Sequence, residues 1–138
     1  MRSRTLASTL LVAGFLVTAI GASSAGGTGP ARQWAIVYLH QPTLVGSTIV
    51  EGPVMFVHDE AKMARGESCT SVRLVEPATG PTEEIAAFHC IPIRRPLAHT
   101  FTITTRANDA LGFGCVLVEY QFAGDTEGHG VPAPANAH

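Results

Sequence analysis

The sequence predicts an all-β fold, a small antiparallel sandwich of about seven strands with one short helix; a small barrel is the alternative. Short runs rich in β-branched and aromatic residues recur between Gly and Pro turn signals, which is typical of such folds. Only one stretch, residues 59–66, is rich in helix formers. The expected strands are 33–40, 43–52, 54–59, 69–76, 83–91, 100–106 and 113–124.

The stretch "DEAKMARG", residues 59–66, carries start and stop signals for a helix of one or two turns. Asp59 can cap the amino-terminal end, because its carboxylate accepts from the first free backbone N–H groups. Gly66 follows the last turn, where glycine commonly ends a helix. We expect the helix to cross the end of the sheet with Met63 turned inward.

The first 25 residues resemble a secretory signal peptide in their layout. Two arginines precede an uncharged apolar run, and small residues follow at the expected cleavage position after Ala25. The rival interpretation is a membrane anchor, since the run is close to the minimum length of a span. We favour cleavage, which predicts a secreted or periplasmic protein with no membrane span after processing.

Composition divides the remainder of the chain into one domain and two flanking segments. Residues 26–32 are a Gly-rich, flexible lead-in, residues 33–130 are a single β domain, and residues 131–138 are a Pro/Ala tail expected to be disordered. Removing the two leader arginines leaves seven basic against eleven acidic residues, a net charge of −4. The chain lacks the positive face that nucleic-acid binding requires.

Two cysteines flank the turn cluster "EPATGPTE", and a hairpin centred between residues 79 and 80 would place them opposite each other. Cys69 then faces Cys90, at a Cα separation that a disulfide tolerates. In an oxidising compartment such a pair is expected to be bonded. By alternation along the strand, His89 would point to the opposite side, toward the core. Free thiols and a metal centre are the alternatives to the disulfide.

The metal alternative uses residues with soft or borderline ligand atoms, which suit copper or zinc. His58 ends a strand immediately before the helix, so it is expected near the start of the 69–76 strand. No compact metal-binding or haem-attachment motif is present to fix the ligand set. The candidate ligands are His58, Met63, His89 and His129, together with the two cysteines if they are not bonded.

A second possible site is the loop "GDTEGHG", residues 124–130. Asp125, Glu127 and His129 recur at every second position, so an extended backbone would project all three from one face. Two carboxylates and an imidazole could hold a hard cation or act as acid and base. The surrounding glycines are equally consistent with a structural loop.

Two further features are the pair Arg94 and Arg95 and the remaining cysteine. Arg94 and Arg95 lie between two prolines and could contact an anion, or could be an exposed, solvated edge. Cys115 is the odd cysteine and is expected to be buried and inert. No nucleophile motif such as GxSxG is present.

The function expected from these features is that of an exported binding or structural module, with its hairpin stapled by Cys69–Cys90, acting on an unknown ligand or protein partner. The alternative is an exported copper- or zinc-binding protein. An enzyme that uses the 124–130 loop ranks third.

Overall fold

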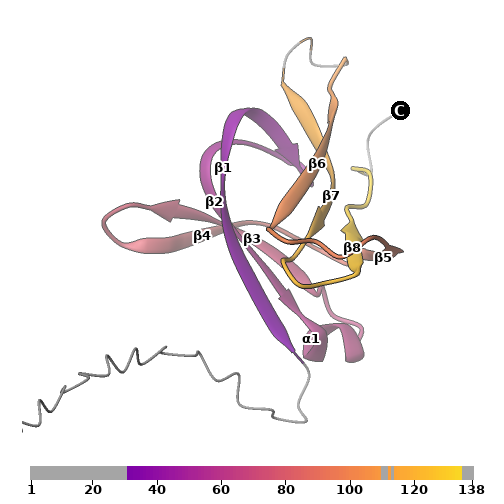
Figure 1. Ribbon diagram of the computed structural model, residues 1–138. Coiled ribbons are helices and arrows are strands. Elements are labelled where there is room, and N and C mark those ends of the chain that lie inside the picture. Colours follow the sequence, from indigo (N-terminus) through magenta and orange to yellow (C-terminus); the bar gives the residue numbers. More distant parts are fainter. Residues whose placement is uncertain (1–30, 110–111, 113, 135–138) are drawn as a thin grey trace, which may run out of the picture.

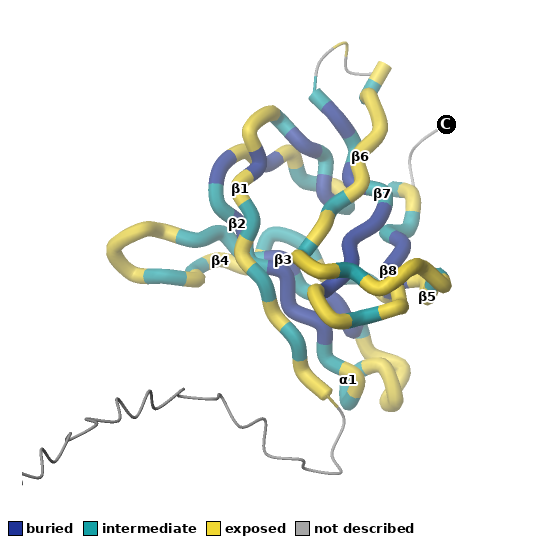
Figure 2. The backbone as a smooth tube through the Cα atoms, in the orientation of Figure 1, coloured by how far each residue is buried: buried dark blue, intermediate teal, exposed yellow. Residues whose placement is uncertain are grey.

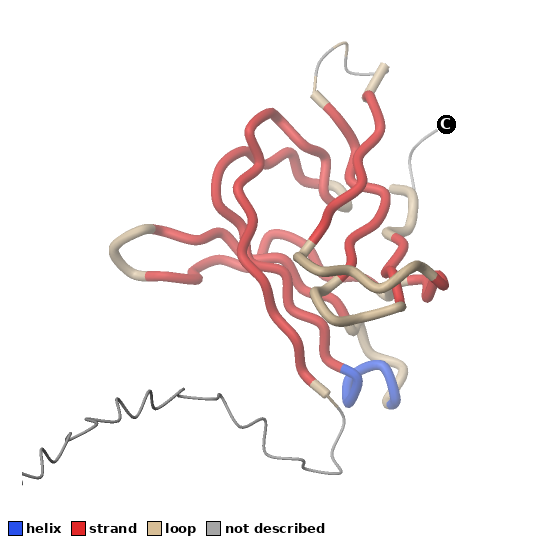
Figure 3. The backbone as a smooth tube through the Cα atoms, in the orientation of Figure 1, coloured by secondary structure: helices blue, strands red, loops and turns tan. Residues whose placement is uncertain are grey.

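The computed structural model describes residues 31–109, 112 and 114–134, which form eight strands and one short helix (Figure 1). The prediction of a mostly β chain is confirmed (Figure 3). The predicted signal peptide and most of the 26–32 lead-in lie outside the described residues, as do the last four residues of the tail. The strands are β1 (Arg32–Val45), β2 (Thr48–Asp59), β3 (Thr70–Glu76), β4 (Gly80–Phe88), β5 (Ile91–Arg94), β6 (Thr102–Ala107), β7 (Cys115–Gln121) and β8 (Glu127–Gly130), and the helix is α1 (Glu60–Ala64).

The eight strands belong to one mixed sheet with the order β4-β3-β2-β1-β7-β8-β5, and β6 pairs with β7. The expectation of purely antiparallel pairing was wrong at one place, because β1 runs parallel to β7 where Thr43 pairs with Cys115. The strands predicted at 33–40, 43–52 and 54–59 are two longer strands in the structure, β1 and β2. Pro42 is accommodated at a shift in register between Leu39 and Thr43, and Gly52 adopts a φ of 97° just before Pro53.

The sheet is strongly curled, which follows from the path of the chain. Strands β4 and β5 are the two ends of the strand order, yet only His89 and Cys90 separate them in the sequence. These two residues therefore carry the chain from one end of the sheet to the other. The curl also brings β2 against β7 across the intervening β1: the rings of Phe56 and Tyr120 have centroids 5.1 Å apart.

The hydrophobic core lies inside this curl, where apolar side chains of several strands pack together. Buried residues are concentrated on β2, β7 and β8, whereas the tip of the β3–β4 hairpin is exposed (Figure 2). The backbone N–H of Val131 donates to Val118 at 2.9 Å, which fixes the chain just after β8. The buried core residues are Leu39, Val45, Val50, Val54, Phe56, Val72, Leu117, Tyr120 and Phe122.

The β3–β4 hairpin forms, but the predicted register was wrong by one residue. Ser71 pairs with Ala87 and Val72 with Ala86, and two further shifts occur between Val72 and Val75. These irregularities absorb the extra residues that a regular hairpin would have placed in the turn. The strands end at Thr70 and Phe88, so neither cysteine is a paired strand residue.

The short helix is confirmed, and its predicted amino-terminal cap is correct. The Asp59 carboxylate accepts from the backbone N–H of Lys62 at 3.2 Å, and Gly66 adopts a φ of 72° beyond the last turn. The prediction that Met63 turns inward was wrong, because its side chain is on the exposed side of the helix. Among the described residues, no helix has the length and hydropathy needed to cross a membrane.

Candidate metal centre

His58, Cys69 and Cys90 converge inside the protein, although they come from three separate parts of the chain. One ligand atom from each residue lies within 4.8 Å of those of the other two. All three are buried, and His58 is only 2% exposed. The sequence offered all three as candidates, but it assigned the cysteines chiefly to a disulfide and the histidine to a separate metal site.

Backbone pairing brings His58 and Cys69 together. His58 is the second-last residue of β2 and pairs with Thr70, the first residue of β3. After α1 the chain returns, and the backbone N–H of Asp59 donates to the Cys69 carbonyl at 2.9 Å. The helix therefore closes a short loop whose two ends carry the imidazole and the first thiol.

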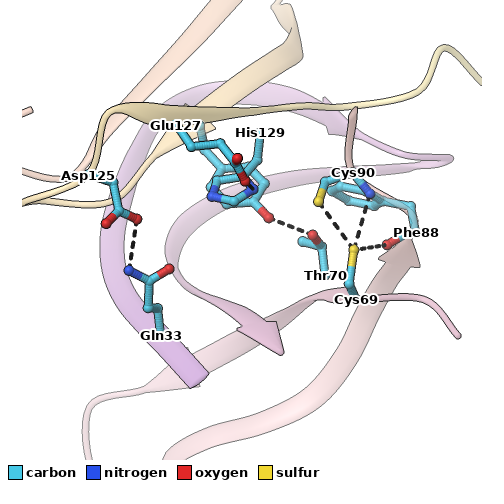
Figure 4. Close-up of polar contacts among 9 residues, drawn as sticks. Gln33, Cys69, Thr70, Phe88, Cys90, Asp125, Glu127 and His129 are labelled. Carbon is cyan, nitrogen blue, oxygen red and sulfur yellow. Dashed lines mark hydrogen bonds and ion pairs between the residues drawn. The ribbon is translucent and has the colours of Figure 1, made fainter. Parts of the chain in front are cut away.

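Cys90 reaches the same place from the connection between β4 and β5. Its sulfur lies 3.2 Å from the Cys69 sulfur, and its backbone N–H donates to that sulfur at 3.4 Å (Figure 4). Both cysteines are present as free thiols. His89, next to Cys90, is exposed, so the prediction that it points into the core was wrong. The predicted opposition of the two neighbouring side chains is correct, because Cys90 is buried.

His129 lies beside this cluster, on β8. Its ring centroid is 4.4 Å from that of His58, and the ring stacks on Tyr120 at 4.8 Å with an interplanar angle of 17°. The Tyr120 hydroxyl is hydrogen-bonded to the Thr70 hydroxyl, next to Cys69. The sequence gave no signal for this support by Thr70 and Tyr120, because it depends on which strands the curl brings together.

None of the four ring nitrogens of His58 and His129 has a hydrogen-bond partner among the described residues. A buried polar group left unpaired costs about 1–3 kcal/mol, and each exception in a folded protein requires an explanation. A bound metal would explain why two adjacent buried histidines beside two thiols lack hydrogen-bond partners, because their ring nitrogens would be its ligands.

The electrostatics of the cluster favour neutral imidazoles and a protonated Cys90 thiol when no metal is bound. Burial lowers the pKa of His58, and burial together with neighbouring His58 lowers the pKa of His129 to about 4. Burial and the contact with Cys69 raise the pKa of Cys90 to about 12. Neutral imidazole is already the metal-binding form, whereas the thiols must release protons to a bound metal.

The donor geometry suits a tetrahedral or trigonal ion. Zinc bonds of about 2.3 Å to sulfur and 2.0–2.1 Å to nitrogen imply donor atoms about 3.4–3.8 Å apart. The sulfur pair at 3.2 Å and the cluster limit of 4.8 Å bracket these values, so small side-chain rotations are sufficient. Cysteine and histidine together are the ligands that zinc and copper prefer.

The predicted Asp125, Glu127 and His129 site is only partly assembled. Glu127 and His129 lie on β8, and the Glu127 carboxylate is 4.0 Å from Nδ1 of His129. Asp125 precedes the strand and accepts from the Gln33 side chain at 2.8 Å (Figure 4). The Asp125 carboxylate is therefore already engaged by the Gln33 amide.

The other predicted residues lie outside the cluster. Arg95 makes a two-point ion pair with Glu119, at 2.7 and 2.6 Å, so its guanidinium is already engaged by a carboxylate. Arg94 is exposed at the end of β5. Cys115 is buried as predicted, with its sulfur 3.3 Å from the Thr43 hydroxyl.

A surface cavity of about 600 Å³ lies on the outer face of β1 and β2, away from the cluster. Trp34 and Ile36 of β1 line it and are 65% and 50% exposed. Nothing in the described residues identifies what covers this face.

Comparison with protein-family models, with curated proteins and with solved structures gave no match to this chain.

Proposed function

We propose that this chain is an exported metal-binding protein whose β domain holds one copper or zinc ion between His58, Cys69 and Cys90. The observation that carries the proposal is the convergence of these three buried ligand groups within 4.8 Å of one another. The unpaired ring nitrogens of His58 support it, because a bound metal would satisfy a buried group that otherwise has no partner.

The place of the ligands in the sheet supports the same proposal. A metal held by residues before β3, at the end of β2 and between β4 and β5 would tie the connection between the two ends of the strand order to β2 and β3. We propose that the curled sheet thereby acts as a small, incompletely closed barrel rather than as two packed sheets. Binding energy at such a site contributes directly to folding, because the unfolded chain does not hold the ligands together.

The second candidate function is the disulfide-stapled binding or structural module. The separation of 3.2 Å between the Cys69 and Cys90 sulfurs favours it, because oxidation needs only a short further approach to the S–S bond length of about 2.05 Å. In this case the domain binds no metal, and the bridge joins the two ends of the β3–β4 hairpin.

The two functions separate in one experiment on the full chain expressed with its leader. The exported protein is purified without chelator, and its metal content and intact mass are measured with and without reductant. The metal proposal expects about one zinc or copper ion per chain and no loss of two hydrogens from the cysteine pair. A metal-free protein that lacks two hydrogens establishes the stapled module instead.

Two cysteine variants test whether the metal is bound by the cluster of His58, Cys69 and Cys90. Cys90→Ser should sharply lower the metal content of the purified protein by removing a ligand. Cys115→Ser is the matched control, because Cys115 is also buried but contacts Thr43 and Gln41, outside the cluster. Equal metal content in the two variants would contradict the proposed site.

A further inference from the structure

His129 is the one imidazole beside the cluster that the three-residue set leaves out. We propose that it completes the centre as a fourth ligand, that Glu127 orients it, and that the bound ion is divalent, of the zinc type. This inference rests on the proposed function and specifies its ligand set and its metal.

His129 lies beside the cluster but outside the set whose ligand atoms are within 4.8 Å of one another, so its side chain must rotate to reach a shared metal. It is 2% exposed, and its ring lies against that of His58, with centroids 4.4 Å apart. β8 is paired on both sides: His129 lies opposite Pro92 of β5 and opposite Tyr120 of β7. The backbone is therefore fixed, and rotation of the side chain is the motion that remains to bring a ring nitrogen to the metal.

Glu127 lies where a modest approach of its carboxylate would give His129 the partner that a metal-bound histidine usually has. Histidines that bind metals commonly donate their second ring N–H to a carboxylate or carbonyl, which fixes the tautomer and the ring orientation. The Glu127 carboxylate is 4.0 Å from Nδ1 of His129, two residues away on the same strand. This arrangement assigns Nδ1 to the carboxylate and leaves Nε2 for the metal.

Charge balance selects a divalent ion. Two thiolates and two neutral imidazoles carry a charge of −2, which a divalent ion cancels and a monovalent copper ion leaves at −1. An uncompensated charge is costly in a buried site. The charged side chains that act on the two imidazoles are acidic ones, Glu60, Asp125 and Glu127 among them, and they add to the preference for the higher cation charge.

The test uses the reduced full chain and cobalt(II), a spectroscopic substitute for zinc, followed by displacement with zinc under a competing chelator. The wild-type protein should give the intense visible bands of a four-coordinate cobalt site with thiolate ligands. His129→Ala should change this spectrum and weaken zinc binding by about 100-fold or more. Glu127→Gln should weaken it by roughly 10–100-fold, as for other partners of metal-bound histidines.

Two exposed positions provide matched controls. His89→Ala removes an imidazole next to Cys90, and Glu83→Gln neutralises an exposed carboxylate on β4; both should bind zinc as the wild type does. Because the Glu127 side chain is 51% exposed, its variant is expected to fold even if His129→Ala does not. Wild-type affinity in Glu127→Gln would overturn the orienting role.

An unchanged spectrum and affinity in His129→Ala would overturn the fourth ligand while leaving the three-residue centre intact. Binding of copper(I) but of neither cobalt nor zinc would overturn the divalent ion alone. The proposed function itself fails in a different way, through a wild-type protein that binds none of cobalt, zinc and copper, or through full binding in His58→Ala.

Discussion

The imidazole of His58 lies against the imidazole of His129, with ring centroids 4.4 Å apart, although the two residues belong to β2 and β8. Strands β1 and β7 lie between these strands in the sheet, so the contact exists only because the sheet curls. It places two neutral bases beside two thiols in a buried space.

Disulfide formation and metal binding should exclude each other, because both use the Cys69 and Cys90 sulfurs. Oxidised glutathione should convert the two thiols of the metal-free protein to a disulfide, taking up two electrons and two protons as it becomes two glutathione thiols. The oxidised protein should then bind no zinc in a chelator competition, and prior zinc loading should slow the oxidation. Cys115→Ser should behave as the wild type, whereas zinc binding by the fully oxidised protein would contradict the site.

The metal-free, reduced protein should lose stability as the pH falls from about 6.5 to 4. Burial and His58 lower the pKa of His129 from 6.5 to about 4 in the folded state, so the unfolded chain binds a proton first. Neutral His129 therefore makes its full contribution to the free energy of unfolding above about pH 6.5. About 3 kcal/mol of that free energy is lost by pH 4.

Urea unfolding at pH 7 and pH 4.5 measures this change, with His129→Phe as the comparison because phenylalanine keeps the stacking on Tyr120 without a titratable group. The variant should show a weaker dependence on pH in this window. The same slope in both proteins would show that His129 does not titrate as described.

Gly128→Ala should weaken both folding and metal binding. An added Cβ would overlap the carboxylate of Glu119, which Arg95 holds in a two-point ion pair. Overpacking of this kind costs about 1–3 kcal/mol, and relief by displacement of β8 would move the adjacent His129. Thermal unfolding and zinc titration measure the two effects, and Ala123→Ser, at an exposed position between β7 and β8, is the control. A variant with wild-type stability and affinity would show that β8 adjusts without cost.

Local sequence signals placed three residues of the proposed centre close together. His58, α1 and Cys69 are close in the sequence, and the capping signals at Asp59 and Gly66 correctly indicated a short helix between two strands. The hairpin turn correctly brought Cys90 near Cys69. The exact register could not be predicted, because two irregularities in β3–β4 shift the pairing in a way that alternation alone does not reveal.

The position of His129 depends on long-range pairing. His89 was expected to point inward because strand alternation was extended past the end of β4, and Met63 was expected near the metal because its helix directly follows His58. Both residues are exposed. His129 was a candidate by residue type, but its position follows from β8 pairing with β7 and β5 and from the curl of the sheet. No local pattern in the sequence encodes the pairing of β8 or the curl of the sheet.

X-ray absorption at the zinc edge of the reduced, zinc-loaded protein tests the central claim most directly. The account predicts a first coordination shell of two sulfurs at about 2.3 Å and two nitrogens at about 2.0–2.1 Å, with one sulfur lost in Cys69→Ser. A shell made only of oxygen and nitrogen, or one unchanged by that substitution, would contradict a metal centre built on Cys69, Cys90 and the two histidines.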